Sequence, residues 1–165
     1  MLTNAVIHEI LSRRSVRSYQ PELISEEEME SLITAAQYAP SAMGRQDRHF
    51  TVVTNAELLD EIQKATGRES FYNAPAAVIV SVPPQNEHGM EDAACAIMNL
   101  MAAAYSMGIS TCYIASATGT KDPQIMRKLQ IPEGYLPAAS VIIGYAKEAP
   151  DEPAPRRADS VTWIK

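Results

Sequence analysis

Three arginines and three serines lie within eight consecutive residues near the start of the chain. The segment is Ser12-Arg13-Arg14-Ser15-Val16-Arg17-Ser18-Tyr19. A guanidinium group is a rigid fork of N–H donors that matches phosphate oxygens, and a serine between two arginines adds a neutral donor. This spacing favours a site for one phosphate-sized anion. The alternative is a solvated helix end, at which the arginines only complement the helix dipole.

A second segment combines small residues with a hydroxyl group and a primary amide. It is Ala39-Pro40-Ser41-Ala42-Met43-Gly44-Arg45-Gln46. A preceding helix must end before Pro40, because the residue before a proline is pushed out of the helical region. We therefore expect a turn here whose backbone a flat ligand can approach closely.

Two predicted helices position these segments. Apolar residues at helical spacing predict a first helix over residues 4–11, with Thr3 or Asn4 as its cap, and this helix leads into the arginines. A capping box of Ser25 and Glu28 predicts a second helix that runs to about Tyr38, just before the turn.

The rest of the chain predicts strands and a long helix. Runs of β-branched and small apolar residues predict strands at 49–54, 76–82, 110–114 and 138–145. The alanine-rich stretch 91–107 predicts the longest helix, and its periodicity fits a subunit interface and an ordinary core helix equally well. Strands with helices between and around them predict an α+β fold, an α/β sandwich.

Composition excludes several classes of function. The net charge of −6 argues against nucleic-acid binding, and no apolar run is long enough to cross a bilayer. With no signal segment, we expect a cytoplasmic protein. The length predicts one domain, residues 1–165, in which the proline-containing residues 149–165 form an extended tail.

Metal, disulfide, hydrolase and dinucleotide signals are missing from the sequence. The three histidines lack the spacing of metal ligands, and neither Gly-x-Ser-x-Gly nor Gly-x-Gly-x-x-Gly occurs. Cys95 and Cys112 form no disulfide pattern, and we expect both to be buried.

Together these residues resemble the nitroreductase family of flavin enzymes. Members have a helix that ends in Arg-Arg-Ser-x-Arg, a helix capped by Ser and Glu, and then Ala-Pro-Ser-Ala-x-Asn-x-Gln before a strand. This chain has all three motifs in order, with Gly44 in place of the asparagine. Asn73-Ala74-Pro75 before a strand and Gly144-Tyr145 before the tail extend the resemblance over nearly the whole chain.

The resemblance implies that FMN is the cofactor and that its N5 atom, rather than any catalytic side chain, performs the chemistry. The arginine segment would bind the phosphate through Arg13, Arg14 and Ser15, with Arg156 or Arg157 of the tail as a further donor. Arg17 would lie near the pyrimidine edge of the flavin ring.

The remaining implied contacts come from three other places in the chain. The turn would contact the ribityl chain and ring edge through Pro40, Ser41, Ala42, Met43 and Gln46. Asn73 would hydrogen-bond the pyrimidine, although an asparagine before Ala-Pro also fits a simple turn cap. The backbone of Ala115 and Ser116 would donate an N–H group to flavin N5.

The implied function is an FMN-dependent oxidoreductase that transfers hydride by a ping-pong mechanism from NADH or NADPH to a nitroaromatic, quinone or similar acceptor. The implied architecture is a homodimer with FMN at the interface, a mixed sheet of about four strands, and a C-terminal strand or tail exchanged between subunits.

The chain resembles a short form of the family, because only ten positions separate Val82 from Asp92 and the usual lid insertion between them is almost absent. Two alternatives stay open. The same flavin fold could perform dehalogenation or flavin fragmentation, or the arginines could belong to a non-enzymatic phosphate- or nucleotide-binding module.

Overall fold

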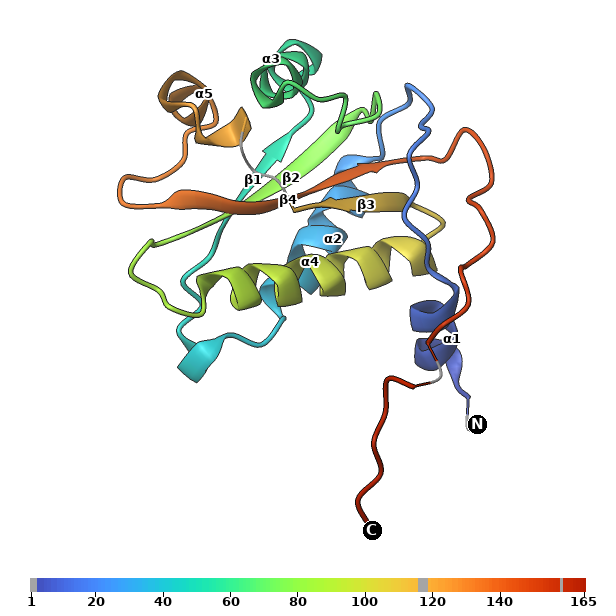
Figure 1. The fold of residues 1–165 in the computed structure, drawn as a ribbon. Coiled ribbons are helices and arrows are strands. Elements are labelled where there is room, and N and C mark those ends of the chain that lie inside the picture. The colour runs from blue at the N-terminus through green and yellow to red at the C-terminus, as the bar shows by residue number, and fades with distance from the viewer. Residues whose placement is uncertain (1–2, 116–118, 158) are drawn as a thin grey trace.

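A four-stranded sheet lies between two layers of helices (Figure 1). The computed structural model describes residues 3–115, 119–157 and 159–165. The helices are α1 (Ala5–Ser12), α2 (Glu26–Gln37), α3 (Ala56–Thr66), α4 (Gly89–Ser106) and α5 (Pro123–Lys128). The strands are β1 (His49–Val53), β2 (Ala76–Val82), β3 (Ser110–Ile114) and β4 (Leu136–Gly144), and two 3₁₀ turns are η1 (Ala42–Gly44) and η2 (Gly119–Lys121).

Side-chain caps begin the first two helices where the sequence predicts. The Asn4 side chain accepts a hydrogen bond from the Ile7 N–H group at 2.9 Å and starts α1. The capping box of Ser25 and Glu28 is present at the start of α2. Such caps satisfy backbone donors that lack partners within the helix, so these boundaries follow from local sequence.

The sheet has the strand order β1-β2-β4-β3, and all three strand pairs are antiparallel. The expectation of mixed strand directions is therefore wrong for these four strands, whereas the α+β class and the number of strands are confirmed. A parallel contact does occur outside them, because Ser15 forms an isolated bridge with Thr111 of β3. The arginine segment thus lies along the β3 edge.

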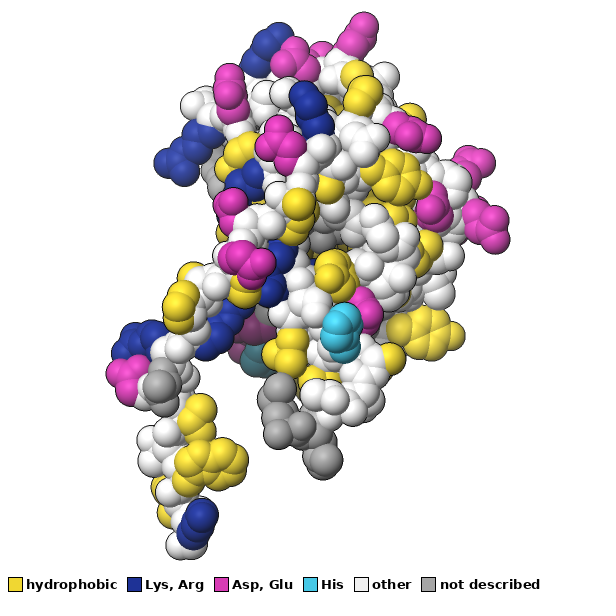
Figure 2. Space-filling view, turned by 90° about the vertical axis from the view of Figure 1, so that its right-hand side faces the viewer, with side chains coloured by type: hydrophobic (Ala, Val, Ile, Leu, Met, Phe, Trp, Pro, Cys, Tyr) yellow, Lys and Arg dark blue, Asp and Glu magenta, His cyan; other side chains and the backbone are white. Residues whose placement is uncertain are grey.

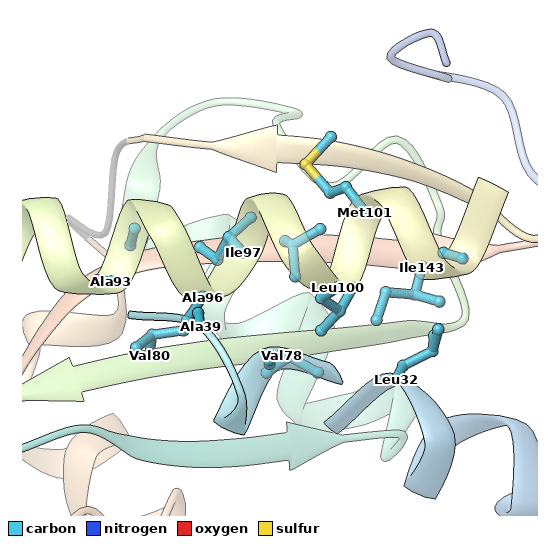
Figure 3. Close-up of a cluster of buried hydrophobic side chains, with 14 of the residues drawn as sticks. Leu32, Ala39, Val78, Val80, Ala93, Ala96, Ile97, Leu100, Met101 and Ile143 are labelled. Atoms are coloured by element: carbon cyan, nitrogen blue, oxygen red, sulfur yellow. The ribbon is translucent and has the colours of Figure 1, made fainter. Parts of the chain in front are cut away.

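Both faces of β2 are buried, as its apolar run predicts. Val78 and Val80 face a core shared with α2 and α4, while Ile79 faces a second core shared with α3 and α5. Figure 3 shows Leu32 of α2 and Leu100 of α4 in the first core. Several fully buried alanines let α4 approach its neighbours closely. This rigid helix connects the two parts of the candidate site.

Several apolar side chains have no cover within one protomer. Helix α1 has no buried residue, and Val6, Ile10 and Leu11 are each more than half exposed. The tail after residue 149 contains no helix or strand among its described residues, and the hydrophobic side chains towards its C-terminal end stand clear of the body (Figure 2). Helix α4 also exposes Cys95, which the sequence analysis wrongly expected to be buried; Cys112 is buried as expected.

Within the described part of the chain, no helix has the length and apolar character needed to span a membrane. The cytoplasmic location and the limits of the domain and its tail stay predictions.

Candidate functional site

The arginine segment is held to the sheet by its backbone. Arg13 ends α1, and the extended chain beyond it bonds β3 through the Val16 N–H group and the Thr111 carbonyl at 3.0 Å. Val16 and Tyr19 are buried in the core beside α3, and the Tyr19 hydroxyl donates to the Val16 carbonyl at 2.8 Å. Burial raises the pKa of the Tyr19 phenol. The buried side chains fix the backbone of this segment, while Arg13 and Arg14 are partly exposed and Arg17 is exposed.

Arg13 has an unused donor at a buried position. Its Nη1 atom is buried and has no hydrogen-bond partner among the described residues. The side chain lines a cavity of about 110 Å³ with Tyr105, Gly108 and Pro150, between the C-terminal end of α4 and the start of the tail. A buried donor without a partner is costly, so this arrangement favours an anion that accepts from it.

Arg14 is bound differently from its neighbour. Its Nη1 atom donates to the carbonyls of Leu11 at 2.8 Å and Arg13 at 2.9 Å. These contacts satisfy carbonyls at the end of α1, which is the helix-end role that the sequence analysis kept as an alternative.

Arg17 lies in a different cavity from Arg13. This cavity of about 310 Å³ is lined by Arg17, Asn73 and Lys147, together with Gln63 of α3. The structure therefore brings together the two residues that the sequence assigned to the pyrimidine edge, although they are far apart in the chain. It also adds a second cation, Lys147, which the sequence analysis missed. Figure 2 looks onto this end of the molecule, where Lys and Arg side chains gather near the base of the tail.

The turn between α2 and β1 has an unusual backbone. Met43 and Gln46 have φ angles of 53° and 58°, and Gly44 between them has 64°. Asn73 is also left-handed, with φ 55°. Non-glycine residues rarely adopt this conformation, and such strain collects at functional sites. Pro40, Ser41, Gly44 and Gln46 line a cavity of about 770 Å³.

This turn is held by hydrogen bonds between its own residues and by hydrogen bonds from residues elsewhere in the chain. The Asp92 carboxylate accepts from the Ala42 N–H group at 2.9 Å, and Ser41 Oγ accepts from the Gln46 N–H group at 3.0 Å. Arg48 donates to the carbonyls of Ala39 at 2.9 Å and Pro40 at 3.1 Å. Asp92 and Arg48 were not singled out from the sequence. An acidic residue in a first helical turn looks like an ordinary dipole contact, and an arginine before a strand carries no signal of its own.

The turn and the Arg13 cavity lie at opposite ends of α4. Asp92, which bonds the turn, and Tyr105, which lines the Arg13 cavity, are separated by thirteen residues of one helix. At a rise of 1.5 Å per residue this is about 20 Å. Within one protomer the two segments singled out from the sequence do not form one compact pocket.

The tail arginines and the loop after β3 complete the predicted set. Arg156 and Arg157 are exposed, and Arg157 forms a bidentate pair with Asp159, at 3.1 Å and 3.0 Å. The Arg157 hydrogen bonds lower the pKa of Asp159. Ala115 is exposed directly after β3, and Ser116 lies outside the described residues.

The residues present fit the phosphate and ring of FMN. Arg13 supplies a buried donor without a partner, and Arg17, Lys147 and Asn73 supply two cations and an amide at a neighbouring cavity. Among the described residues, no group of histidine, cysteine or acidic side chains could hold a metal ion.

Comparisons with known proteins find relatives in sequence and in overall fold. A protein of Archaeoglobus fulgidus with the provisional name NADH dehydrogenase/NAD(P)H nitroreductase is 32% identical over 149 residues, 86% of each chain. A nitroreductase from Bacteroides fragilis, solved with bound FMN, superimposes with a TM-score of 0.89 at 31% identity and covers 99% of this chain and 100% of its own. A second nitroreductase solved with FMN, from Desulfitobacterium hafniense, gives a TM-score of 0.88 at 27% identity, with 99% and 100% covered.

The model of the nitroreductase family matches residues 10–88 and 64–145, which include the arginine segment, the turn and all four strands. The chain therefore belongs to the nitroreductase family.

Proposed function

We propose that this protein is an FMN-dependent oxidoreductase that takes hydride from NADH or NADPH and passes it to a nitroaromatic, quinone or similar acceptor in a ping-pong cycle. Family membership and relatives solved with FMN support the cofactor. When bound, FMN supplies the hydride chemistry, and the protein supplies its position and electrostatic environment.

The observation on which this proposal rests most is the buried Arg13 Nη1 atom without a partner. A phosphate oxygen would give that donor a charge-assisted hydrogen bond, which is stronger than a bond between neutral groups. Ser15 follows two residues later and Arg156 is the tail arginine without an ion pair to any described residue. These three side chains are the proposed phosphate ligands.

Arg17 and Lys147 would act on the electronics of the ring. Both line the cavity that also contains Asn73. Reduction places negative charge on the pyrimidine side of a flavin, and nearby cations stabilise that charge. Arg17 would therefore favour the reduced form, while Asn73 would orient the pyrimidine by hydrogen bonding.

We propose a homodimer in which each flavin is shared. The turn lies about 20 Å from the Arg13 cavity along α4, so a twofold contact is the simplest way to bring the turn of one protomer to the arginines of the other. Exposed apolar residues support such a contact: Val6 and Ile10 on α1, and Met90 and Met98 on α4. Val6 and Ile10 lie four residues apart on one face of α1, and exposed apolar side chains that adjoin in this way mark interaction surfaces.

The tail would complete the dimer. Val161, Trp163 and Ile164 are exposed in an extended segment, with Ile164 at 96%. The outer edge of β1 pairs with no strand among the described residues, and an unpaired edge accepts an added strand. Exchange of the tail between subunits would cover both features.

The acceptor site would be open. Only residues 83–88 connect β2 to α4, so this connection contains no lid insertion. This favours small planar acceptors over substrates that must be enclosed, and therefore favours simple reduction over dehalogenation or flavin fragmentation.

Three measurements test the proposal. Purified protein should be yellow, with flavin absorbance, and should release FMN on denaturation. Stopped-flow reduction with NADH and NADPH, followed by a panel of nitroaromatic, quinone and halogenated acceptors, would then identify the reaction. Protein that takes up no FMN from an excess of it would contradict the proposal and favour a phosphate-binding module.

A further inference from the structure

We infer that Asp92 is a positioning residue that holds the turn at residues 40–46 in the shape needed to contact the flavin. The inference rests on the proposed function, because it concerns how one part of that FMN site is kept in place.

Asp92 is a buried carboxylate whose contacts all lie outside its own helix. Its side chain belongs to α4 and the residue is 4% exposed. One oxygen, Oδ1, accepts from the Ala42 N–H group at 2.9 Å, and the other, Oδ2, accepts from Asn86 Nδ2 at 3.3 Å. Asn86 Oδ1 in turn accepts from the His88 N–H group at 3.0 Å.

This pattern differs from that of an ordinary acidic residue in a first helical turn. Such a residue usually faces solvent or bonds the N–H groups of its own helix. Here the carboxylate reaches the first residue of η1, fifty positions away in sequence. Because Ala42 donates to a charged acceptor, this bond is among the stronger ones that hold the turn.

The turn needs such a bond because its own conformation is strained. Met43, Gly44 and Gln46 are left-handed, and two of them have side chains that disfavour this region. Arg48 holds the residues before the turn through the carbonyls of Ala39 and Pro40, and it also donates to the Asp92 carbonyl at 3.2 Å. Asp92 thus bonds η1 itself and connects the strained residues to helix α4.

A set of four variants tests this role. Asp92→Ala removes both hydrogen bonds, and Asp92→Asn keeps the acceptor for Ala42 but places a donor opposite Asn86. The exchange of Asn86→Asp with Asp92→Asn keeps the net charge and restores all three hydrogen bonds, because donor and acceptor change places. Asn55→Ala is the matched control, since it removes a side-chain acceptor from the Leu58 N–H group at the start of α3, away from the turn.

Two readouts separate positioning from general stability. Hydrogen exchange of a peptide covering residues 39–48, measured without FMN, should be faster in Asp92→Ala and unchanged in Asn55→Ala. The FMN dissociation constant should rise about tenfold in Asp92→Ala, rise less in Asp92→Asn, and return to within about threefold of the original value in the exchanged pair.

The inference would be overturned if Asp92→Ala and Asp92→Asn bound FMN as tightly as the unaltered protein, or if the exchanged pair were no better than Asp92→Asn alone. If the unaltered protein does not bind FMN, the proposed function is refuted instead. Hydrogen exchange of the peptide covering residues 39–48 would still test whether Asp92 holds the turn. If Asp92→Ala does not fold, the comparison of Asp92→Asn with the exchanged pair decides the question, because both keep side chains of nearly the same shape.

Discussion

The arginine segment and the turn lie at the two ends of α4 and use their polar groups in opposite ways. Around the arginines, donors are left over: Arg13 Nη1 is buried without a partner among the described residues, and Arg17 is exposed beside Lys147. In the turn, most polar groups bond one another, through Asp92, Arg48 and Ser41, and Arg48 Nε is the one donor of these three side chains that is buried without a partner among the described residues.

This difference separates two tasks. A segment with unused cationic donors is arranged to attract charge, and its energy improves when an anion arrives. A segment that is strained but internally bonded is arranged to keep a shape. We therefore expect changes at the arginines to alter affinity and potential directly, and changes at the turn to alter stability and local order, and FMN affinity through the shape of the turn.

The largest expected effect comes from Arg13→Ala. The variant should lose one or two charge-assisted hydrogen bonds, each of about 1.5–3 kcal/mol, so the affinity for FMN should fall on the order of 100-fold. Its thermal stability without FMN should not fall, because the lost Nη1 donor has no partner among the described residues. Fluorescence titration and thermal unfolding measure the two quantities.

Arg14→Ala is the natural control for that experiment, since its guanidinium already bonds the end of α1. It should reduce stability slightly and leave FMN affinity within a few-fold. Equal losses of affinity in the two variants would show that net charge alone, and not the Arg13 position, attracts the phosphate.

Arg17→Gln should change the flavin more than it changes binding. Loss of a cation beside the pyrimidine should lower the two-electron reduction potential by about 30–60 mV, which corresponds to roughly 1.4–2.8 kcal/mol. Arg17→Lys should leave the reduction potential closer to that of the unaltered protein, because it retains the positive charge. Equilibration with redox dyes measures it, and an unchanged potential in Arg17→Gln would place the guanidinium away from the ring.

In the turn, Gly44→Ala should reduce stability by about 1 kcal/mol, because φ is +64° and an added Cβ meets no atom within 4 Å. Gly67 has the same φ and the same open space at the end of α3, so Gly67→Ala is a matched control. Urea unfolding should give similar losses in both variants, whereas only Gly44→Ala should weaken FMN binding. A loss of FMN affinity in both would mean that stability, not the turn, controls binding.

The smallest expected effect lies outside both regions, at the start of α2. Hydrogen bonds from the Ser25 hydroxyl and backbone N–H group, with a further one from the Tyr145 hydroxyl, lower the pKa of Glu28 from its ordinary value. A lowered pKa means that the stabilisation is present above about pH 4.5 and is lost as the pH falls through the folded-state pKa. The stability difference between the unaltered protein and Glu28→Gln should therefore shrink towards acid, as followed by urea unfolding from pH 7 to 3.

Local signals in the sequence predicted the elements well. The caps Asn4 and Ser25 begin helices as expected. Each of these contacts spans only a few residues, so the sequence contains the whole interaction. The motifs likewise identified the family, because their residues and their order can be read from the sequence without knowing which segments come together.

Long-range contacts could not be predicted in the same way. Strand direction depends on which strands pair, and β2 pairs with β4 although α4, β3 and α5 come between them in the chain. The same holds for Asp92 and Ala42, and for Lys147 beside Arg17. The sequence also placed the arginines and the turn in one site without revealing that a helix separates them within one protomer.

The most direct test of the central proposal, a flavin shared between the arginines of one protomer and the turn of its partner, is complementation in mixed dimers. Arg13→Ala protein and a turn variant with Ser41→Ala and Gln46→Gly should each bind FMN poorly. If they are unfolded together and refolded as a mixture, each mixed dimer should contain one site with both defects and one with none, so tight FMN binding should reappear. A mixture that binds FMN no better than its two components would contradict the shared site.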